Sequence, residues 1–345
     1  MINYNRLGYE IKRDLANFSE KISNGLKRPQ SKFLLQMIYG ILAGNKLHLS
    51  EIARSLNENI TLKKTIDRLS RNLSAFKEKE TVMKNYISEV KKQINEENAV
   101  IIIDNSDITK PCSPKMEAIS DVHDGSTGEI RKEYFTVEAA VLSQNKKNAT
   151  PRLRKGLFGG RKRGYQCNTR ESTMLEISYI PVQLCEFPNK TLVLVAVYGF
   201  GAQPMLLLTN LDLSEKKKLC MIATKVYLMR WRIEEYFKFK KQQFELEDLR
   251  VMSLQSIRNL NLFATLVTGY IGIMSCEKDD TIFMLELKEC SKRIFDVPKF
   301  IFYGLGYAIE RVLARTHSGI KGFLLKKEQS QQLTLAECFA ELGFK

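Results

Sequence analysis

Charged and aromatic residues alternate along YLMRWRIEEYFKFKKQQFELEDLR, from Tyr227 to Arg250. Placed on a helix at about 100° per residue, four polar side chains fall within an arc of about 60°. These four are Tyr227, Arg230, Glu234 and Lys241, and Lys238 and Glu245 extend their stripe. An apolar stripe runs beside it through Val226, Ile233, Phe237 and Phe244, while Trp231 and Leu249 flank its other side. The pattern predicts a helix that is buried except along one polar groove.

The simpler interpretation is a surface helix with ion pairs four residues apart, such as Arg230 with Glu234. Asp104, which follows an apolar run, favours a chemical role instead. An aspartate at a strand end and a glutamate on a later helix are suited to hold divalent metal ions. Two ions about 3.5–4 Å apart activate a water or hydroxyl and stabilise the leaving oxygen in phosphodiester chemistry. Carboxylate oxygens suit Mg²⁺, or Mn²⁺ in its place, and the neighbouring cations would contact the DNA backbone.

These residues need a strand and a helix to position them. AVIIID, Ala99–Asp104, is apolar without alternation, which indicates a strand covered on both faces, although a buried helical segment has the same pattern. Further strands are predicted at 132–142, 191–200 and 204–211, and helices from Ser214 onward. With helices before residue 98, this order predicts an α/β core behind a helical N-terminal domain.

Two amphipathic segments in the N-terminal region are joined by a short polar break. LHLSEIARSL has Ser50 as a plausible N-cap, and TLKKTIDRLSRNL follows with Leu62, Ile66, Leu69 and Leu73 on one side. Helix, turn and basic helix is the form of a helix-turn-helix that binds DNA, but two ordinary bundle helices have the same pattern.

The composition favours a polyanionic partner. The 345 residues carry a formal net charge of +15, so nucleic acid is the first candidate and an anionic membrane surface the second. Seven scattered cysteines without a C-x-x-C pair, and three histidines, give little support to zinc and fit a reducing compartment. The apolar run Leu262–Met274 is shorter than the roughly 20 residues of a membrane span, so we expect a buried helix in a cytoplasmic protein.

The spacing Y-x2-R-x3-E-x6-K resembles the signature of DDE insertion-sequence transposases, which have an RNase H-like core. Here it is formed by Tyr227, Arg230, Glu234 and Lys241, between LLLTNL and LEDLR. IIIDNSDITKP resembles the first catalytic strand, and SDVHDGSTGEIRKEYFTVEAAVL resembles the two strands after it. The resemblance covers about 99–143 and 190–275. It implies a mixed-sheet core at 99–275, between a DNA-binding helical domain at 1–98 and helices at 276–345.

The resemblance also implies roles for individual residues. Asp104 and Glu234 would be catalytic metal ligands for Mg²⁺ or Mn²⁺. Tyr227, Arg230 and Lys241 would contact phosphates of the transposon end, with Lys238 on the same stripe. Trp231 would stack on a base or sugar, or pack in the core. Members of this family cut DNA by hydrolysis, join the freed 3′-hydroxyl to target DNA, and act as a synaptic dimer in the cytoplasm, at the nucleoid.

The chain departs from the family at the middle aspartate. No aspartate occurs between Asp124 and Asp212, and the place of its motif is taken by Gln144–Arg170, a segment with nine Lys or Arg residues and no acid. We therefore expect that one strand and one helix of the core are missing, and that cleavage is impaired. Residues that would substitute for the missing acid are Asp121, Asp124, Glu171, Glu176 and Asp212.

Three functions remain open from the sequence. The first is a transposase, and the second is a non-catalytic truncated transposase that occupies DNA ends as a competitor or inhibitor. The third, an RNA-binding protein, is the weakest, because only Phe158 and Tyr165 interrupt the basic segment with aromatic rings.

Overall fold

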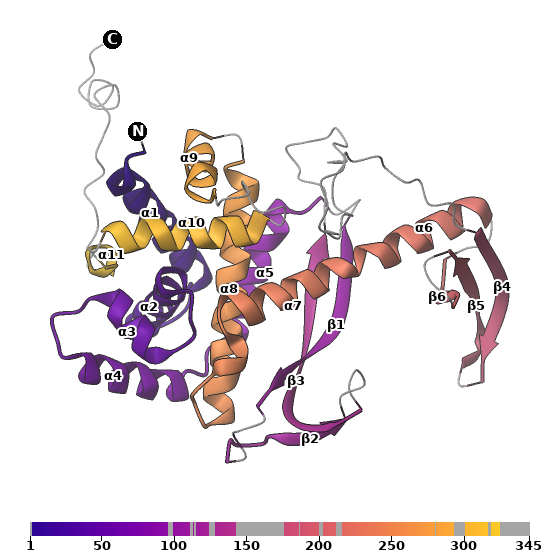
Figure 1. The fold of residues 1–345 in the computed structure, drawn as a ribbon, viewed down its shortest axis with the longest axis horizontal. Coiled ribbons are helices and arrows are strands. Elements are labelled where there is room, and N and C mark those ends of the chain that lie inside the picture. Colours follow the sequence, from indigo (N-terminus) through magenta and orange to yellow (C-terminus); the bar gives the residue numbers. More distant parts are fainter. Residues whose placement is uncertain are drawn as a thin grey trace, which may run out of the picture. The chain divides into compact units, whose positions relative to one another are not determined.

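The structure is a computed structural model, and its described part is a mixed α/β fold with two three-stranded sheets (Figure 1). The structure describes residues 2–95, 99–110, 113, 115–123, 128–142, 176–185, 187–199, 203–211, 216–279, 281–292, 301–316 and 319–324. The basic segment Gln144–Arg170 lies outside these ranges.

The chain divides into two compact units, which do not follow the three consecutive domains expected from the sequence. Unit 1 comprises Met1–Ile94, Asp107–Phe135 and Phe239–Lys345, and unit 2 comprises Asn95–Ser106 and Thr136–Lys238. The described residues within 107–135 and 239–324 therefore belong with the N-terminal helices. Three of the boundaries fall inside elements: one in the strand Val100–Thr109, one in the strand Ile130–Leu142, and one in the helix Trp231–Gln243.

Helices from both ends of the chain build unit 1. They are α1 (Tyr4–Ile22), α2 (Arg28–Gly44), α3 (Leu49–Leu56), α4 (Leu62–Ala75), α5 (Lys79–Gln93), α8 (Leu254–Glu277), α9 (Ile282–Cys290), α10 (Ile301–Thr316) and α11 (Lys321–Leu324). In α1, apolar residues recur every three or four positions, and Leu7, Ile11 and Leu15 are completely buried. The fold of unit 1 thus follows from amphipathic stripes that share one core.

Helix α8 is the central apolar helix of unit 1. Within the described residues it alone is long and apolar enough to cross a membrane, and 61% of its most apolar window is buried. Phe263, Leu266 and Val267 are fully buried in the shared core. The expectation of a buried helix at Leu262–Met274 is confirmed, and the helix is longer than the apolar run.

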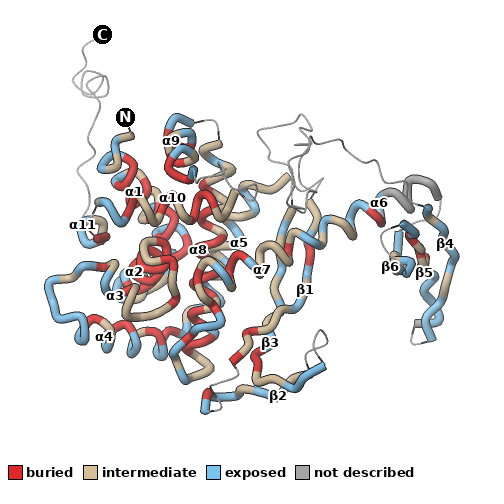
Figure 2. The backbone as a smooth tube through the Cα atoms, in the orientation of Figure 1, coloured by how far each residue is buried: buried red, intermediate tan, exposed pale blue. Residues whose placement is uncertain are grey.

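The two amphipathic N-terminal segments form α3 and α4. Helix α3 begins at Leu49 after His48, so the prediction of Ser50 as the N-cap is wrong; Ser50 lies in the first turn. Asn57 ends α3 in the left-handed conformation, with φ 47°. Helix α4 buries Leu69 and Leu73 and leaves its other side exposed (Figure 2). Helix, turn and helix are therefore present.

The first sheet contains the strand of Asp104. Its strands are β1 (Val100–Thr109), β2 (Ser120–His123) and β3 (Ile130–Leu142), in the order β1-β3-β2. The prediction that the strand ends at Asp104 is wrong, because pairing continues: the Lys110 amide donates to the Lys132 carbonyl at 2.7 Å. Residues of β1 alternate, with Ile101 and Ile103 66% and 69% exposed. One face of this strand is thus uncovered by the described residues, against the expectation of two covered faces.

The second sheet lies entirely in unit 2. Strands β4 (Glu176–Leu184), β5 (Phe187–Tyr198) and β6 (Met205–Thr209) pair antiparallel in that order. Val193, Val195 and Val197 form its small core. Helix α6 (Lys216–Met229) contacts all three strands. The described strands therefore form two separate sheets, where the sequence led us to expect one mixed sheet.

The signature stretch is not one continuous helix. Helix α6 ends at Met229, α7 runs from Trp231 to Gln243, and a 3-10 helix covers Leu246–Asp248. Between α6 and α7, the Arg230 amide donates to the Tyr227 carbonyl at 2.9 Å, a tighter turn than in an α-helix. Of the predicted apolar stripe, Ile233 and Phe244 are fully buried, whereas Val226 is 40% exposed.

Candidate functional site

Asp104 and Glu234 meet at one guanidinium group in unit 2. Arg230 Nη1 lies 2.8 Å from Asp104 Oδ2, and Arg230 Nη2 lies 2.7 Å from Glu234 Oε1. Asp104 comes from β1, Arg230 from the turn after α6, and Glu234 from the first turn of α7. The structure thus brings together the two acids that the sequence proposed as partners. The group between them is a side chain that was expected to contact DNA.

This triad is partly shielded from water. The side chains of Asp104, Arg230 and Glu234 are 23%, 36% and 39% exposed. Burial lowers the pKa of Arg230, but the hydrogen bond to Asp104 and the charge of Glu234 outweigh this effect, and its pKa is raised. The arrangement therefore stabilises a positive charge between two carboxylates.

Two aromatic rings lie beside the guanidinium group. The Arg230 guanidinium carbon is 5.6 Å from the centre of the Tyr227 ring and 5.9 Å from that of Trp231. Trp231 is 51% exposed, which argues against the alternative that it packs in the core. Both rings hold the guanidinium group by cation–π contact and leave it reachable from solvent.

Glu138 on β3 is a third carboxylate that the sequence reasoning missed. The Tyr236 hydroxyl, on α7, donates to Glu138 Oε2 at 2.5 Å. The Thr136 hydroxyl donates to the Ser106 carbonyl, and a regular antiparallel ladder in that register places Glu138 opposite Asp104. Cross-strand partners share one face of a sheet. The alternating apolar pattern of β3 could have placed Glu138 on a face, but the register depends on long-range pairing.

Lys241 is held by two other acids in unit 1. Its Nζ lies 3.0 Å from Asp107 Oδ1 and 3.0 Å from Glu247 Oε1. Burial lowers the pKa of Lys241, but the hydrogen bonds to Asp107 and Glu247 more than compensate, and its pKa is raised. Asp107 follows Asp104 on β1 and was not singled out from the sequence. Lys238, also expected to contact DNA, is exposed.

Lys240 differs from its neighbours because it is only 1% exposed. Its Nζ donates to Asn261 Oδ1 at 2.8 Å and to Thr265 Oγ1 at 3.1 Å, both on α8. The sequence analysis did not single out this lysine. Its buried amine instead attaches α7 to the central helix of unit 1.

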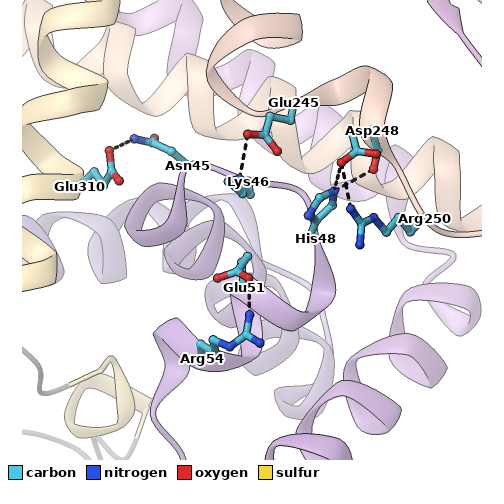
Figure 3. Close-up of polar contacts among 9 residues, drawn as sticks. All are labelled: Asn45, Lys46, His48, Glu51, Arg54, Glu245, Asp248, Arg250 and Glu310. Atoms are coloured by element: carbon cyan, nitrogen blue, oxygen red, sulfur yellow. Dashed lines mark hydrogen bonds and ion pairs between the residues drawn. The ribbon is translucent and has the colours of Figure 1, made fainter.

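Within the described residues, one trio of side chains has ligand atoms spaced for a metal ion: His48, Glu245 and Asp248. Figure 3 shows that each already has a protein partner. His48 Nε2 lies 3.0 Å from Asp248 Oδ2, Glu245 Oε1 lies 2.9 Å from Lys46 Nζ, and Asp248 also pairs with Arg250. With a lysine and an arginine balancing the two acids, the cluster is best explained as an ion-pair network that fastens the α2–α3 loop to residues 245–250.

If a divalent ion bound in unit 2, Asp104 and Glu234 would be the residues to hold it. Asp104 and Glu234 offer hard oxygens from two elements and already share a cationic group. No third Asp, Glu, His or Cys of the described residues lies at ligand spacing from this pair. Of the expected substitutes, Asp121 pairs with Lys132 at 2.8 Å, and Glu176 begins β4. Asp124, Glu171 and Asp212 lie outside the described residues.

Comparison with known proteins leaves the family open. No protein-family model matches the sequence, and no curated protein is significantly similar to it.

Proposed function

We propose that this chain is a DNA-binding protein of DDE transposase ancestry, with an incomplete RNase H-like core and weakened cleavage. The observation that carries the proposal is the convergence of Asp104 and Glu234 on Arg230. Asp104 is far from the other two in the sequence, and all three are residues to which the resemblance assigns a site role. A surface helix with only local ion pairs would not reach Asp104 on β1.

Asp104 and Glu234 are the residues that would hold Mg²⁺ or Mn²⁺. Such an ion supplies a polarised water or hydroxyl and charge stabilisation for phosphodiester hydrolysis and strand transfer. The protein's own contribution is to place two carboxylates and several cations around one phosphate. Arg230, Trp231 and Tyr227 surround the acids in unit 2, while Lys238 and Lys241 carry positive charge further along α7.

A non-catalytic competitor is the second candidate, and two observations favour it. No third ligand joins Asp104 and Glu234 within the described residues, so a two-ion site lacks a bridging carboxylate. Among the described strands, β1 lies at the edge of its sheet, and it exposes Ile101 and Ile103. An uncovered apolar face on a strand with this sequence is consistent with the loss of a core strand and its helix.

DNA is the partner that the charge supports. The formal net charge is +15, and phosphate contacts would supply most of the affinity. Helices α3 and α4 are the candidate DNA-binding element of the N-terminal region, and a homodimer on two DNA ends would be the working state. Each phosphate contact contributes to a linear fall of log affinity with log salt, so affinity should drop steeply as salt increases.

The test compares binding with cleavage. Duplex DNA from the ends of the chain's own genetic element is titrated with wild type, Asp104→Ala and Glu234→Ala, and nicking is followed with Mg²⁺ or Mn²⁺. We expect all three proteins to bind with a steep salt dependence, and the wild type to nick slowly or not at all. Efficient nicking that depends on Asp104 would refute the impairment. Absence of DNA binding by the wild type would refute the proposed function itself.

A further inference from the structure

Arg230 uses both terminal nitrogens of its guanidinium group to bond Asp104 and Glu234. Nη1 bonds the first acid at 2.8 Å and Nη2 the second at 2.7 Å. The planar guanidinium group binds a phosphate through the same pair of parallel N–H donors. A phosphate bound through Nη1 and Nη2 would therefore compete with the two carboxylates for the same nitrogens.

A divalent ion bound by Asp104 and Glu234 would compete with the Arg230 guanidinium group for the same two carboxylates. The guanidinium group supplies the positive charge between two carboxylates that would otherwise repel each other. An ion bound by these two acids would have to approach the guanidinium closely, and like charges at that range repel strongly. Metal binding and the carboxylate-bound form of Arg230 therefore compete.

We infer that Arg230 is a positioning residue that keeps Asp104 and Glu234 together as a stand-in for the metal, and that it moves onto DNA phosphate when DNA binds. Transfer of the guanidinium group to phosphate frees both acids for a divalent cation. Its place in the turn between α6 and α7, outside either helix, allows the side chain to move without breaking a helix. Tyr227 and Trp231 flank the guanidinium group in its carboxylate-bound position.

This exchange links the two ligands of the proposed function, on which the inference rests. If DNA removes a competitor of the metal, DNA must increase metal affinity, and metal must increase DNA affinity by the same factor. Without DNA, the wild type should bind divalent ions weakly even though both acids are in place. Loss of the positive charge at residue 230 should increase the metal affinity, as the binding of DNA does.

The experiment measures Mn²⁺ affinity by electron paramagnetic resonance or calorimetry, with no activity involved. Wild type, Arg230→Gln and Arg230→Lys are titrated alone and with a saturating duplex, and the binding of Mn²⁺ to duplex alone is subtracted. We expect Arg230→Gln to bind Mn²⁺ about two- to fivefold more tightly than wild type without DNA, a change that corresponds to one exposed charge interaction. Arg230→Lys keeps the charge but loses the paired N–H donors of the guanidinium group. Its Mn²⁺ affinity should lie between those of wild type and Arg230→Gln.

Two controls assign the effect to this pair of acids. In the Arg230→Gln background, Asp104→Asn or Glu234→Gln should abolish the gain. His48→Ala should leave it unchanged, which excludes binding at the ion-pair network of Glu245 and Asp248. Circular dichroism confirms that each variant is folded, and the charge-retaining Arg230→Lys variant serves if Arg230→Gln does not fold.

The outcomes separate the exchange from the proposed function. Mn²⁺ affinity that rises with DNA in the wild type, but not in Arg230→Gln, supports the exchange. Equal Mn²⁺ affinity in all proteins, with and without DNA, would overturn it while DNA binding stands. If the wild type binds no DNA, yet Arg230→Gln shows the expected gain in Mn²⁺ affinity, the stand-in role would be retained, and both the transfer to phosphate and the DNA-binding function would be refuted.

Discussion

Replacement of Asp107 by asparagine should strengthen DNA binding, because it removes one of the two acids that hold a cation. Lys241, expected to contact phosphate, is held at 3.0 Å by Asp107 and by Glu247. Asparagine keeps the shape of Asp107 and its contact with the Thr109 hydroxyl, which lies 2.9 Å away. The change therefore removes one negative charge beside Lys241 with little repacking.

The size of the effect follows from the exposure of the pair. The side chains of Lys241 and Asp107 are 23% and 40% exposed, so water screens much of their attraction. An ion pair of this kind contributes about 0.5–1 kcal/mol. DNA that no longer competes with Asp107 should gain up to the same amount, or about a two- to fivefold lower Kd. Unfolding free energy should fall by no more than this.

Fluorescence anisotropy with a labelled duplex at fixed salt measures the change. Asp279→Asn is the matched control, because Lys288 and Asp279 form an ion pair at 2.9 Å with side chains 23% and 36% exposed. Both variants raise the net charge by one and remove one carboxylate partner of a lysine. We expect tighter binding for Asp107→Asn than for Asp279→Asn. Equal affinities would show that only total charge matters, and weaker binding by folded Asp107→Asn would refute the role of Lys241.

Three further predictions concern stability. Burial raises the pKa of Asp107, but its hydrogen bonds, including the one from Lys241, and the charge of Lys241 together outweigh this effect, and the pKa lies below the ordinary value of 3.8. The ionised Asp107 therefore stabilises the fold above pH 3.8, and this stabilisation is lost as pH falls below that value. The difference in unfolding free energy between wild type and Asp107→Asn should shrink over the same range. Gly269→Ala should destabilise by about 1–3 kcal/mol, because the new methyl group would overlap the Tyr86 ring, whereas Gly272→Ala on the same helix meets Phe302 at 3.5 Å and should be neutral or stabilising in thermal unfolding. Asn259→Ala should cost about 2–4 kcal/mol in urea unfolding, because its amide donates to the carbonyls of Leu73 and Phe76 at 2.7 and 2.9 Å, and a stable variant would show that water replaces these bonds.

Local patterns in the sequence predicted the features that depend on local physics. Helical periodicity identified α3, α4 and the core helix α8, and it placed Ile233 and Phe244 inside the protein. Spacing of charges placed Arg230 one turn from Glu234, which is the ion pair observed. The meeting of Asp104 with Glu234 was expected from the metal chemistry of a strand-end aspartate with a helix glutamate and from the family resemblance, because no local pattern links a strand to a helix more than a hundred residues later.

Features that depend on pairing across the chain were not predicted. Strand β1 continues past Asp104 because β3 offers it backbone partners up to Lys132, and this pairing also sets Glu138 opposite Asp104. Lys240 is buried because α8 provides two oxygen acceptors, although periodicity treats lysine as polar. Helix α3 begins at Leu49, after His48 whose ring contacts Asp248, and not after Ser50. In each case, a residue distant in sequence decides the outcome.

Anomalous diffraction from crystals of the chain with a short duplex and Mn²⁺ would locate the cation that Asp104 and Glu234 share. We expect a manganese peak between the two carboxylates, with the Arg230 guanidinium group on a DNA phosphate. A DNA complex in which Arg230 still bonds both acids, or in which manganese lies only at His48, Glu245 and Asp248, would contradict the assignment.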